Sequence, residues 1–227
     1  MDLSRSYAFF QPETVKERIH IIGCGAGGST VAEMLCRLGL TKFSLYDFDV
    51  IEGVNIQNQM YREPDIGRKK VDAMRDLLLS INPEAEPDIQ IFEEGYIRQR
   101  LDGYVFLCVD NIDLRRKIAT AQRGNQQIKA MFDFRNGMLD AQHFAADWSD
   151  PEAVEGFLSS MQFTHEEAEA EAETNQSACH MEKSSVVLTI RGGASVVVAN
   201  FLNFVQKGRI EPMVLSWPVD FNIAVCS

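Results

Sequence analysis

The stretch Arg18-Ile19-His20-Ile21-Ile22-Gly23-Cys24-Gly25-Ala26-Gly27-Gly28 decides the fold of the first half of the chain. Its apolar part, residues 18–22, is typical of a strand that is buried on both faces of a sheet. The glycine-rich turn leads into a helix predicted over residues 29–38, which Gly39 ends. A second strand over residues 42–46 completes a β–α–β unit, which predicts a parallel sheet.

The glycines of this turn fit the binding of a phosphate group. Gly23 permits the tight turn, Gly25 lets a phosphate approach the backbone, and Gly28 allows close helix packing. The start of the helix adds unpaired N–H groups and a partial positive charge. Asp47 ends the second strand, about where a carboxylate would hold a ribose hydroxyl. The stretch predicts a nucleotide site, and a nicotinamide-dependent oxidoreductase is one of the enzyme classes that it fits.

Strands and helices continue to alternate along the chain. After a polar loop, a helix is predicted from Gly67 to about Ser80. The next predicted elements are strands over residues 88–92, 104–109 and 127–132, with a helix that ends near Gln122 before the last of them. This alternation predicts an α/β fold with a Rossmann-like, mostly parallel sheet flanked by helices.

The pattern changes after Asn136-Gly137. Residues 138–146, 213–217 and 221–225 are predicted to be strands, the first of them antiparallel, so the C-terminal part adds antiparallel strands to the sheet. Residues 184–204 are mostly apolar but contain Arg191, glycines and asparagines, which favours a buried core helix over a membrane span.

Residues 150–183 have no strong periodicity and contain an acidic run over residues 166–173. The run is interpreted as a solvated helix face or loop, and a docking surface for a basic partner is the alternative.

Composition narrows the classes of partner. The 227 residues carry a net charge of −11, which argues against nucleic-acid and membrane-surface partners because both are negatively charged. The five cysteines are scattered and contain no Cys-x-x-Cys pair, which argues against a disulfide framework and a structural zinc site. The first residues have no signal-peptide pattern, so a cytoplasmic location is expected.

Polar residues at four places carry a more specific pattern. They are Asp47-x-Asp49, Asn55-x-x-Asn58-Gln59, Gly67-x-x-Lys70, and Asp110-Asn111 after the fourth strand. In this order and context they resemble the ThiF/MoeB family of adenylyltransferases, which is related to ubiquitin-activating enzymes. The resemblance implies a single adenylation domain over residues 1–227. Its parts would be a nucleotide-binding core over residues 18–147, a crossover loop over residues 150–183, and a C-terminal helix and strands over residues 184–227.

Members of this family activate a carboxylate, usually the C-terminal glycine of a small β-grasp protein. The carboxylate attacks the α-phosphate of ATP and gives an acyl-adenylate and pyrophosphate. By resemblance, the chain is expected to be an ATP-dependent adenylyltransferase that works as a homodimer. Its partner would be a ubiquitin-like or sulfur-carrier protein that ends in Gly-Gly.

The resemblance also implies a role for each polar residue of the pattern. Asp47 would hold the ribose, Lys70 would neutralise phosphate charge, and Asp110 would hold Mg²⁺. Asn55 and Gln59 would lie beside the phosphates, and Asn111 near the adenine or ribose. The full set of expected nucleotide-binding residues is Gly23, Gly25, Gly28, Asp47, Asp49, Asn55, Asn58, Gln59, Lys70, Asp110 and Asn111. A helix N-cap is the alternative for Asp110-Asn111, and an ordinary exposed lysine for Lys70.

One position departs from the family pattern. The arginine of Asn-x-x-Arg-Gln is Asn58 here, and losing such a donor costs orders of magnitude in rate. Arg62 or Arg68 is the candidate replacement. Without a replacement, the chain would be a non-catalytic member that binds nucleotide or partner. Many members also contribute an N-terminal arginine across a dimer interface, for which Arg5 is the candidate.

The cysteines receive separate interpretations. Members that transfer the activated carboxylate use a cysteine in the crossover loop, where Cys179 falls, and His180 and Lys183 would lower its pKa. An ordinary loop cysteine is the alternative. Sulfur-transferring members often carry a four-cysteine zinc site, whose cysteine pairs are missing here, so no zinc is expected. The remaining expectation is that Cys24, Cys36 and Cys108 are inert core residues.

Overall fold

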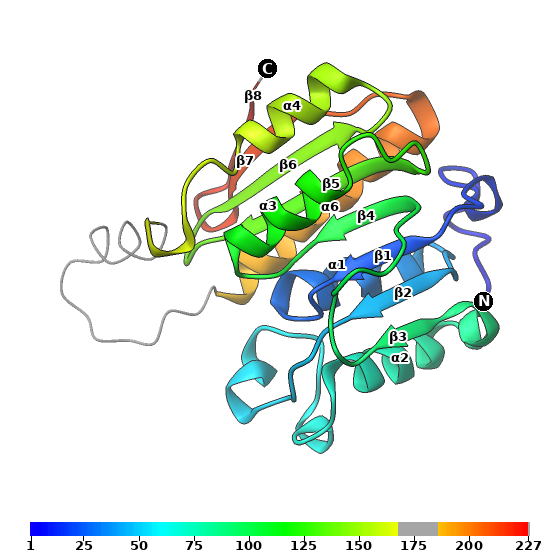
Figure 1. Cartoon of the computed structure of the whole chain (residues 1–227). Coiled ribbons are helices and arrows are strands. Elements are labelled where there is room, and N and C mark those ends of the chain that lie inside the picture. The colour runs from blue at the N-terminus through cyan, green and yellow to red at the C-terminus, as the bar shows by residue number, and fades with distance from the viewer. Residues whose placement is uncertain (168–185, 227) are drawn as a thin grey trace.

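The computed structural model describes residues 1–167 and 186–226. Eight strands form one sheet in the order β3-β2-β1-β4-β5-β6-β7-β8, with helices on both faces (Figure 1). The parallel strands are β1 (Ile19–Ile22), β2 (Phe43–Tyr46), β3 (Gln90–Phe92), β4 (Gly103–Leu107) and β5 (Ile128–Asn136). The antiparallel strands are β6 (Ala141–Asp147), β7 (Met213–Trp217) and β8 (Asn222–Cys226). The predicted fold class is confirmed.

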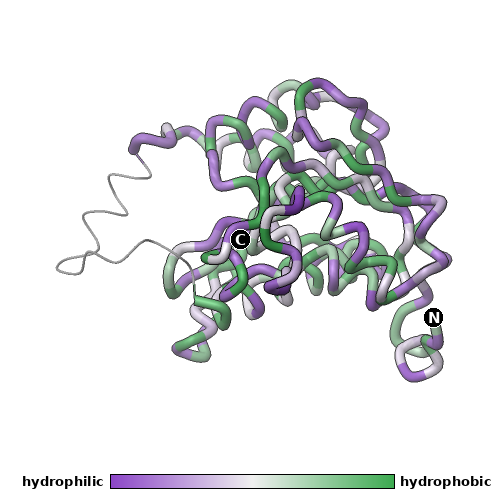
Figure 2. The backbone as a smooth tube through the Cα atoms, turned by 90° about the horizontal axis from the view of Figure 1, so that it is seen from below, coloured by the Kyte–Doolittle hydropathy of each residue, from purple (hydrophilic) through white to green (hydrophobic). Residues whose placement is uncertain are grey.

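Two groups of helices cover the two faces of the sheet. One face is covered by α1 (Ala26–Arg37), α2 (Lys70–Ile81) and α6 (Val187–Lys207). The other face is covered by α3 (Ile112–Ala121) and α4 (Pro151–Ser159). Hydrophobic and hydrophilic residues alternate along the helices, as expected for elements with one buried face (Figure 2). The short 3₁₀ helices are η1 (Pro12–Thr14), η2 (Gly53–Gln57), η3 (Glu63–Asp65), η4 (Pro83–Asp88) and η5 (Pro218–Asp220).

The central strands are buried on both faces, which explains their nearly continuous apolar sequence. In β1, Ile19 and Ile21 belong to the core beneath α1 and α6, whereas Ile22 belongs to the core beneath α3 and α4. His20 is the polar exception, and its ring lies 3.0 Å from the Tyr46 hydroxyl and 2.9 Å from the Asp102 carboxylate. Burial lowers the pKa of His20.

Helix α6 is long and apolar enough, by length and composition alone, to cross a membrane. Half of its most apolar window is buried, and the helix packs against α1, β5 and β6. Two glycines allow this packing: a Cβ on Gly193 would lie 2.6 Å from Ala141, and one on Gly192 would lie 2.5 Å from Pro218. These contacts are those of a core helix. Gly208, in the left-handed conformation with φ of 64°, ends it.

Several elements differ from their predictions, among them α4 and β5. Helix α4 lies within residues 150–183, for which no element was predicted, and its N-terminus is capped by the Asp150 carboxylate. It escaped prediction because it has 9 residues, which is too few to establish a helical period. Strand β5 extends to Asn136, beyond its predicted end at residue 132, because β6 pairs with it from Ala130 to Asn136.

Candidate active site

A cleft of about 1190 Å³ opens at the carboxyl ends of the parallel strands. Ligands of open α/β sheets bind at this edge. The cleft brings together most of the residues predicted from the sequence, namely Gly23, Gly25, Asp47, Asp49, Asn58, Gln59, Lys70, Asp110 and Asn111. Of the described residues that were predicted for the site, Gly28, Asn55, Arg62, Arg68 and Arg5 do not line it.

Three of the glycines in the turn differ in the space around them. Gly23 has φ of 94°, and a Cβ there would lie 2.8 Å from the backbone at the end of β4. A Cβ on Gly28 would lie 1.8 Å from the carbonyl oxygen of Gly23, so only glycine fits. Gly25, by contrast, has nothing within 4 Å of such a Cβ. Gly23 and Gly28 therefore shape the turn, whereas Gly25 leaves open space over the backbone, where a phosphate group would fit.

The N-terminus of α1 faces this open space. Its N-cap is Gly25, and no side chain caps it. The first backbone N–H groups of a helix have no intrahelical acceptor, and the helix dipole adds a partial positive charge there. The end of α1 can therefore bind an anion.

Asp47 is fixed at the end of β2 by the backbone. Its two oxygens accept hydrogen bonds from the N–H groups of Cys24 (2.6 Å) and Asp49 (2.9 Å). Each carboxylate oxygen can accept a further bond, for example from a ribose hydroxyl. Burial raises the pKa of the Asp47 carboxyl, and both backbone bonds and the charge of Lys70 oppose that rise.

Lys70 is the first residue of α2, and its side chain points into the cleft rather than into solvent. Its ammonium group lies 2.7 Å from Asp49, and the side chain is 9% exposed. Its neighbour Lys69 instead donates to the carbonyl of Phe48 (2.6 Å) and does not line the cleft. The structure thus singles out Lys70 from the basic run at residues 68–70.

The segment that carries the Asn-x-x-Asn-Gln pattern lies beside Lys70. Asn58 is buried against the cleft, and the buried Oε1 of Gln59 accepts no hydrogen bond from a described residue. A buried amide that lacks a partner is costly, which suggests that Gln59 pairs with a ligand. The side chain of Asn55 instead accepts a hydrogen bond from the backbone N–H of Glu52 (2.9 Å) and so stabilises η2.

Asp110 and Asn111 follow β4 and have separate environments. Asn111 caps α3, since its side-chain oxygen accepts from the N–H of Leu114 at 2.9 Å. The helix-cap alternative therefore holds for Asn111. Asp110 is exposed in the cleft and is available to a cation.

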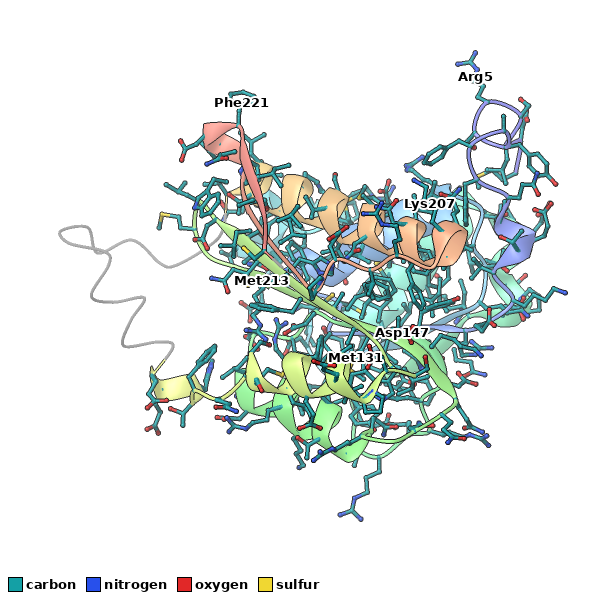
Figure 3. All side chains as sticks on the ribbon, turned by 90° about the horizontal axis from the view of Figure 1, so that it is seen from above. Arg5, Met131, Asp147, Lys207, Met213 and Phe221 are labelled. Carbon is teal, nitrogen blue, oxygen red and sulfur yellow. The ribbon has the colours of Figure 1, made fainter. Side chains whose placement is uncertain are left out.

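The remaining predicted residues lie elsewhere or outside the described ranges. Arg62 is 3.7 Å from Asp65, and Arg68 pairs with both Asp65 and Asp76. Arg5 projects from the molecule (Figure 3). Its segment packs near Gly39, at the amino ends of the strands, away from the cleft. Cys179, His180 and Lys183 lie outside the described residues. Burial raises the pKa of Cys36 to about 11 and of Cys108 to about 12, and raises that of Cys24 strongly.

Two supporting residues escaped prediction from the sequence. Tyr61 is buried behind the glycine turn, and its hydroxyl donates to the carbonyl oxygen of Cys24 at 2.6 Å. Arg115, buried on α3, donates to carbonyls at the ends of β4 and β5, including those of Leu107 (3.1 Å) and Phe134 (2.9 Å). Their role could not be predicted, because it consists of contacts with backbone atoms of distant elements.

The family comparison agrees with this geometry. The model of the ThiF family matches residues 5–132.

The chain belongs to the ThiF family.

Relatives of this ThiF-family chain include ubiquitin-like modifier-activating enzyme 5 from two organisms. The Caenorhabditis briggsae protein is 30% identical over 143 residues, which cover 56% of this chain and 32% of that protein. The Bombyx mori protein is 33% identical over 125 residues, which cover 48% of this chain and 32% of that protein. The ThiF-family chain therefore matches about a third of the length of these curated relatives.

Solved structures share the fold of this ThiF-family chain. Escherichia coli MccB bound to succinimide has a TM-score of 0.73 and 15% identity, over 95% of this chain and 65% of that one. PaaA has a TM-score of 0.72 and 18% identity, over 94% of this chain and 73% of the PaaA chain. The same MccB has also been solved with ATP, with a TM-score of 0.72, 17% identity and coverage of 95% and 65%. At these identities the likeness concerns the fold alone.

Proposed function

We propose that this protein is an ATP-dependent adenylyltransferase that activates the C-terminal carboxylate of a small β-grasp protein as an acyl-adenylate. One observation carries the proposal. In a ThiF-family fold, a single cleft brings the glycine turn together with Asp47, Lys70 and Asp110. These residues provide a polar anchor, an anion site, a cation and a carboxylate, which are the parts that adenylation needs.

Each part would act on a different portion of ATP. Asp47, held by the N–H groups of Cys24 and Asp49, would accept hydrogen bonds from the ribose. The open backbone at Gly25 and the N-terminus of α1 would bind phosphate oxygens. Lys70 would leave its contact with Asp49 and contact the phosphates instead. There it would offset the negative charge that develops on pyrophosphate.

A magnesium ion fits the cleft as a cation shared between protein and nucleotide. The described residues contain no group of three or more acidic, histidine or cysteine side chains that could hold a metal by themselves. Asp110 would supply one carboxylate, and phosphate oxygens and water would supply the other ligands, which is the usual environment of Mg²⁺. When bound, the ion would neutralise phosphate charge.

A second candidate function rests on Asn58. This residue lies in the cleft where the family pattern has an arginine, and neither Arg62 nor Arg68 lines the cleft. Such a member would bind nucleotide or a partner protein without adenylating it. That Arg62 replaces the arginine of the family pattern stays a prediction, since an exposed side chain can move when a ligand binds.

Partner, assembly and location are further parts of the proposal. The relatives named ubiquitin-like modifier-activating enzyme 5 support a ubiquitin-like partner. That this partner, or a sulfur carrier in its place, ends in Gly-Gly is part of the proposal. A homodimer would let the exposed Arg5, which lies away from the cleft of its own chain, approach the cleft of a second copy. The scattered cysteines support a reducing compartment, and we place the protein in the cytoplasm.

The decisive experiment is ATP–pyrophosphate exchange with a candidate β-grasp protein and Mg²⁺. We expect exchange with the wild type and its loss in Asp110→Ala, because the carboxylate that holds the cation is removed. Glu86→Ala, an exposed carboxylate outside the cleft, is the matched control and keeps full exchange. Nucleotide binding without exchange would favour the non-catalytic function instead. Unchanged exchange in Asp110→Ala would show that the assignment of Asp110 is wrong.

Cys179 requires its own measurement, because activation and transfer are separate steps. We expect Cys179→Ala to keep pyrophosphate exchange and to lose any thioester with the partner. A thioester that survives this substitution would exclude Cys179 as the nucleophile.

A further inference from the structure

Asp133 on β5 is fully buried and pairs with two arginines. Arg115 from α3 contacts one carboxylate oxygen, and Arg135, two residues further along β5, contacts the other at 2.6 Å. One carboxylate and two guanidinium groups leave one positive charge in excess. Arg115 is turned inward, toward the backbone carbonyls of Leu107 and Phe134. Both arginines line the cleft, but the Arg135 side chain is 13% exposed and that of Arg115 is 5% exposed, so Arg135 brings more of the excess charge to the surface of the cleft.

Arg135 is held in a fixed orientation. Its Nε donates to Asp133 (2.7 Å), and Nη1 and Nη2 donate to the carbonyl and hydroxyl oxygens of Ser160, both at 2.9 Å. The guanidinium also lies over the ring of Phe144, 4.2 Å from its centroid. Nη1 carries two hydrogens, and among the described residues only the Ser160 carbonyl accepts one. A fixed cation with a donor left over is suited to bind an anionic oxygen.

The order of the strands places Arg135 at the end of the cleft opposite Asp47. Asp47 follows β2, the glycine turn follows β1, Asp110 follows β4, and Arg135 ends β5, so the four sites lie in this order across the sheet. A nucleotide with its ribose at Asp47 and its phosphates at the turn occupies the β2–β1 side. The acceptor must then approach Asp110 from the β5–β6 side. Asn136 and Gln142 line that side with uncharged polar groups, and Asp140, between β5 and β6, lines it with a carboxylate.

We propose that Arg135 binds the carboxylate of the acceptor and positions it beside the α-phosphate. This inference rests on the proposed adenylyltransferase function. It assigns the acceptor end of the cleft to β5 and β6, and it names an acceptor-binding residue outside the Asn-x-x-Asn-Gln segment. Burial lowers the pKa of Arg135 to about 10, so the group is still charged at neutral pH.

The test compares two synthetic peptides that end in Gly-Gly, one with a free carboxylate and one with a C-terminal amide. Their affinities are measured on the full chain saturated with Mg²⁺ and a non-hydrolysable ATP analogue. We expect the wild type to prefer the free acid about tenfold, as for one charge-assisted contact. Arg135→Gln should bind both peptides equally while its affinity for the nucleotide analogue stays unchanged. Arg123→Gln, which removes a 61% exposed arginine outside the cleft, is the matched control.

Arg135→Gln also removes a partner of buried Asp133, so two measurements protect the test from a folding defect. Arg135→Lys keeps a charge beside Asp133 and should retain part of the preference for the acid. In the wild type, the NMR signal of the Arg135 Nε–H should move on addition of the acid peptide and not of the amide. Equal binding of the two peptides by the wild type, or an intact preference in a folded Arg135→Gln variant, would overturn the inference.

The outcome is distinguishable from that of the proposed function. A wild type that performs exchange, with a folded Arg135→Gln variant that still prefers the acid, contradicts only the assignment of Arg135. A wild type that distinguishes the peptides through Arg135 and performs no exchange contradicts only the proposed catalysis.

Discussion

At the scale of single residues, the glycines of the turn differ in how closely other atoms surround them. Gly28 contacts the carbonyl of Gly23, whereas Gly25 faces open space in the cleft. Substitution of Gly28 should therefore mainly reduce stability, and substitution of Gly25 should mainly reduce nucleotide affinity.

We predict that Gly28→Ala destabilises the fold by about 3 kcal/mol or more, because its Cβ would overlap backbone that cannot move aside. Gly25→Ala should cost only about 1 kcal/mol, since alanine is a poorer N-cap than glycine, yet it should weaken ATP binding by filling the phosphate space. Urea unfolding and ATP titration measure the two effects. Equal stability of the two variants would contradict the assigned roles.

His143 on β6 is a buried histidine whose neutral state is fixed by its neighbours. Asn200 donates to its Nε2 at 2.8 Å, so the ring proton is on Nδ1, which faces the carbonyl of Asp133 at 3.3 Å. Burial lowers the pKa of His143 from its usual 6.5 to about 3. The unfolded chain therefore binds a proton at this residue at a pH where the folded chain does not.

The consequence is a loss of stability in acid. The contribution of His143 is intact above pH 6.5 and declines as the pH falls toward 3, by at most about 1.4 kcal/mol per pH unit. We predict that His143→Gln flattens this slope between pH 7 and 5 whatever its effect on stability at pH 7. Urea unfolding at several pH values gives the slope, and identical slopes for variant and wild type would refute the prediction.

At the scale of elements, the approach of α6 to the sheet depends on a residue without a side chain. A Cβ on Gly193 would lie 2.6 Å from Ala141 and 2.7 Å from Phe134. We predict that Gly193→Ala destabilises the protein by about 2 kcal/mol, although alanine favours helix formation. Ser195→Ala, at an exposed position of the same helix, should change stability by less than about 0.5 kcal/mol. Thermal unfolding distinguishes the two, and similar values would show that α6 has room to shift.

The elements with a repeating pattern could be predicted from the sequence, and the others could not. The prediction for β7 is confirmed to the residue, and Gly39, with φ of 95°, follows α1 as expected. Helix α1 begins at Ala26 rather than at residue 29, because its first turn consists of glycines and alanine that give no amphipathic signal. Helix α4 was missed because it is short.

The residues of the candidate site also fall into two groups, those that could be predicted from the sequence and those that could not. Residues in the short sequence motifs, such as Asp47 and Lys70, could be predicted to lie in one cleft because the edge of the sheet brings the strand ends together. Arg115 and Arg135 could not, because both pair with Asp133, and the sequence does not show that this carboxylate is buried beside an arginine of α3.

At the scale of the whole molecule, a ligand that binds only the folded chain stabilises all of it. At one hundred times its dissociation constant, ATP·Mg²⁺ should add about 2.7 kcal/mol. For a chain of this size that corresponds to a rise in Tm of about 5–10 °C. We predict this rise for ATP·Mg²⁺ and not for NAD. The opposite result would favour the nicotinamide-dependent alternative.

Lys70→Ala should reduce that rise, because the nucleotide loses a cation beside its phosphates. A tenfold weaker affinity at the same ATP concentration would leave about 1.4 kcal/mol of stabilisation. Lys129→Ala, exposed and outside the cleft, is the matched control and should keep the full rise. Equal rises in the two variants would mean that Lys70 does not contact the nucleotide.

Phe134 has a consequence for how the sequence can vary among relatives. A Cβ on Gly27, in the first turn of α1, would lie 2.6 Å from its ring, and one on Gly193 of α6 would lie 2.7 Å from the same ring. Positions 27 and 193 are far apart in sequence, yet both are limited by one side chain. We expect the three positions to covary: a homologue with a larger residue at position 27 or 193 should have a smaller one at position 134.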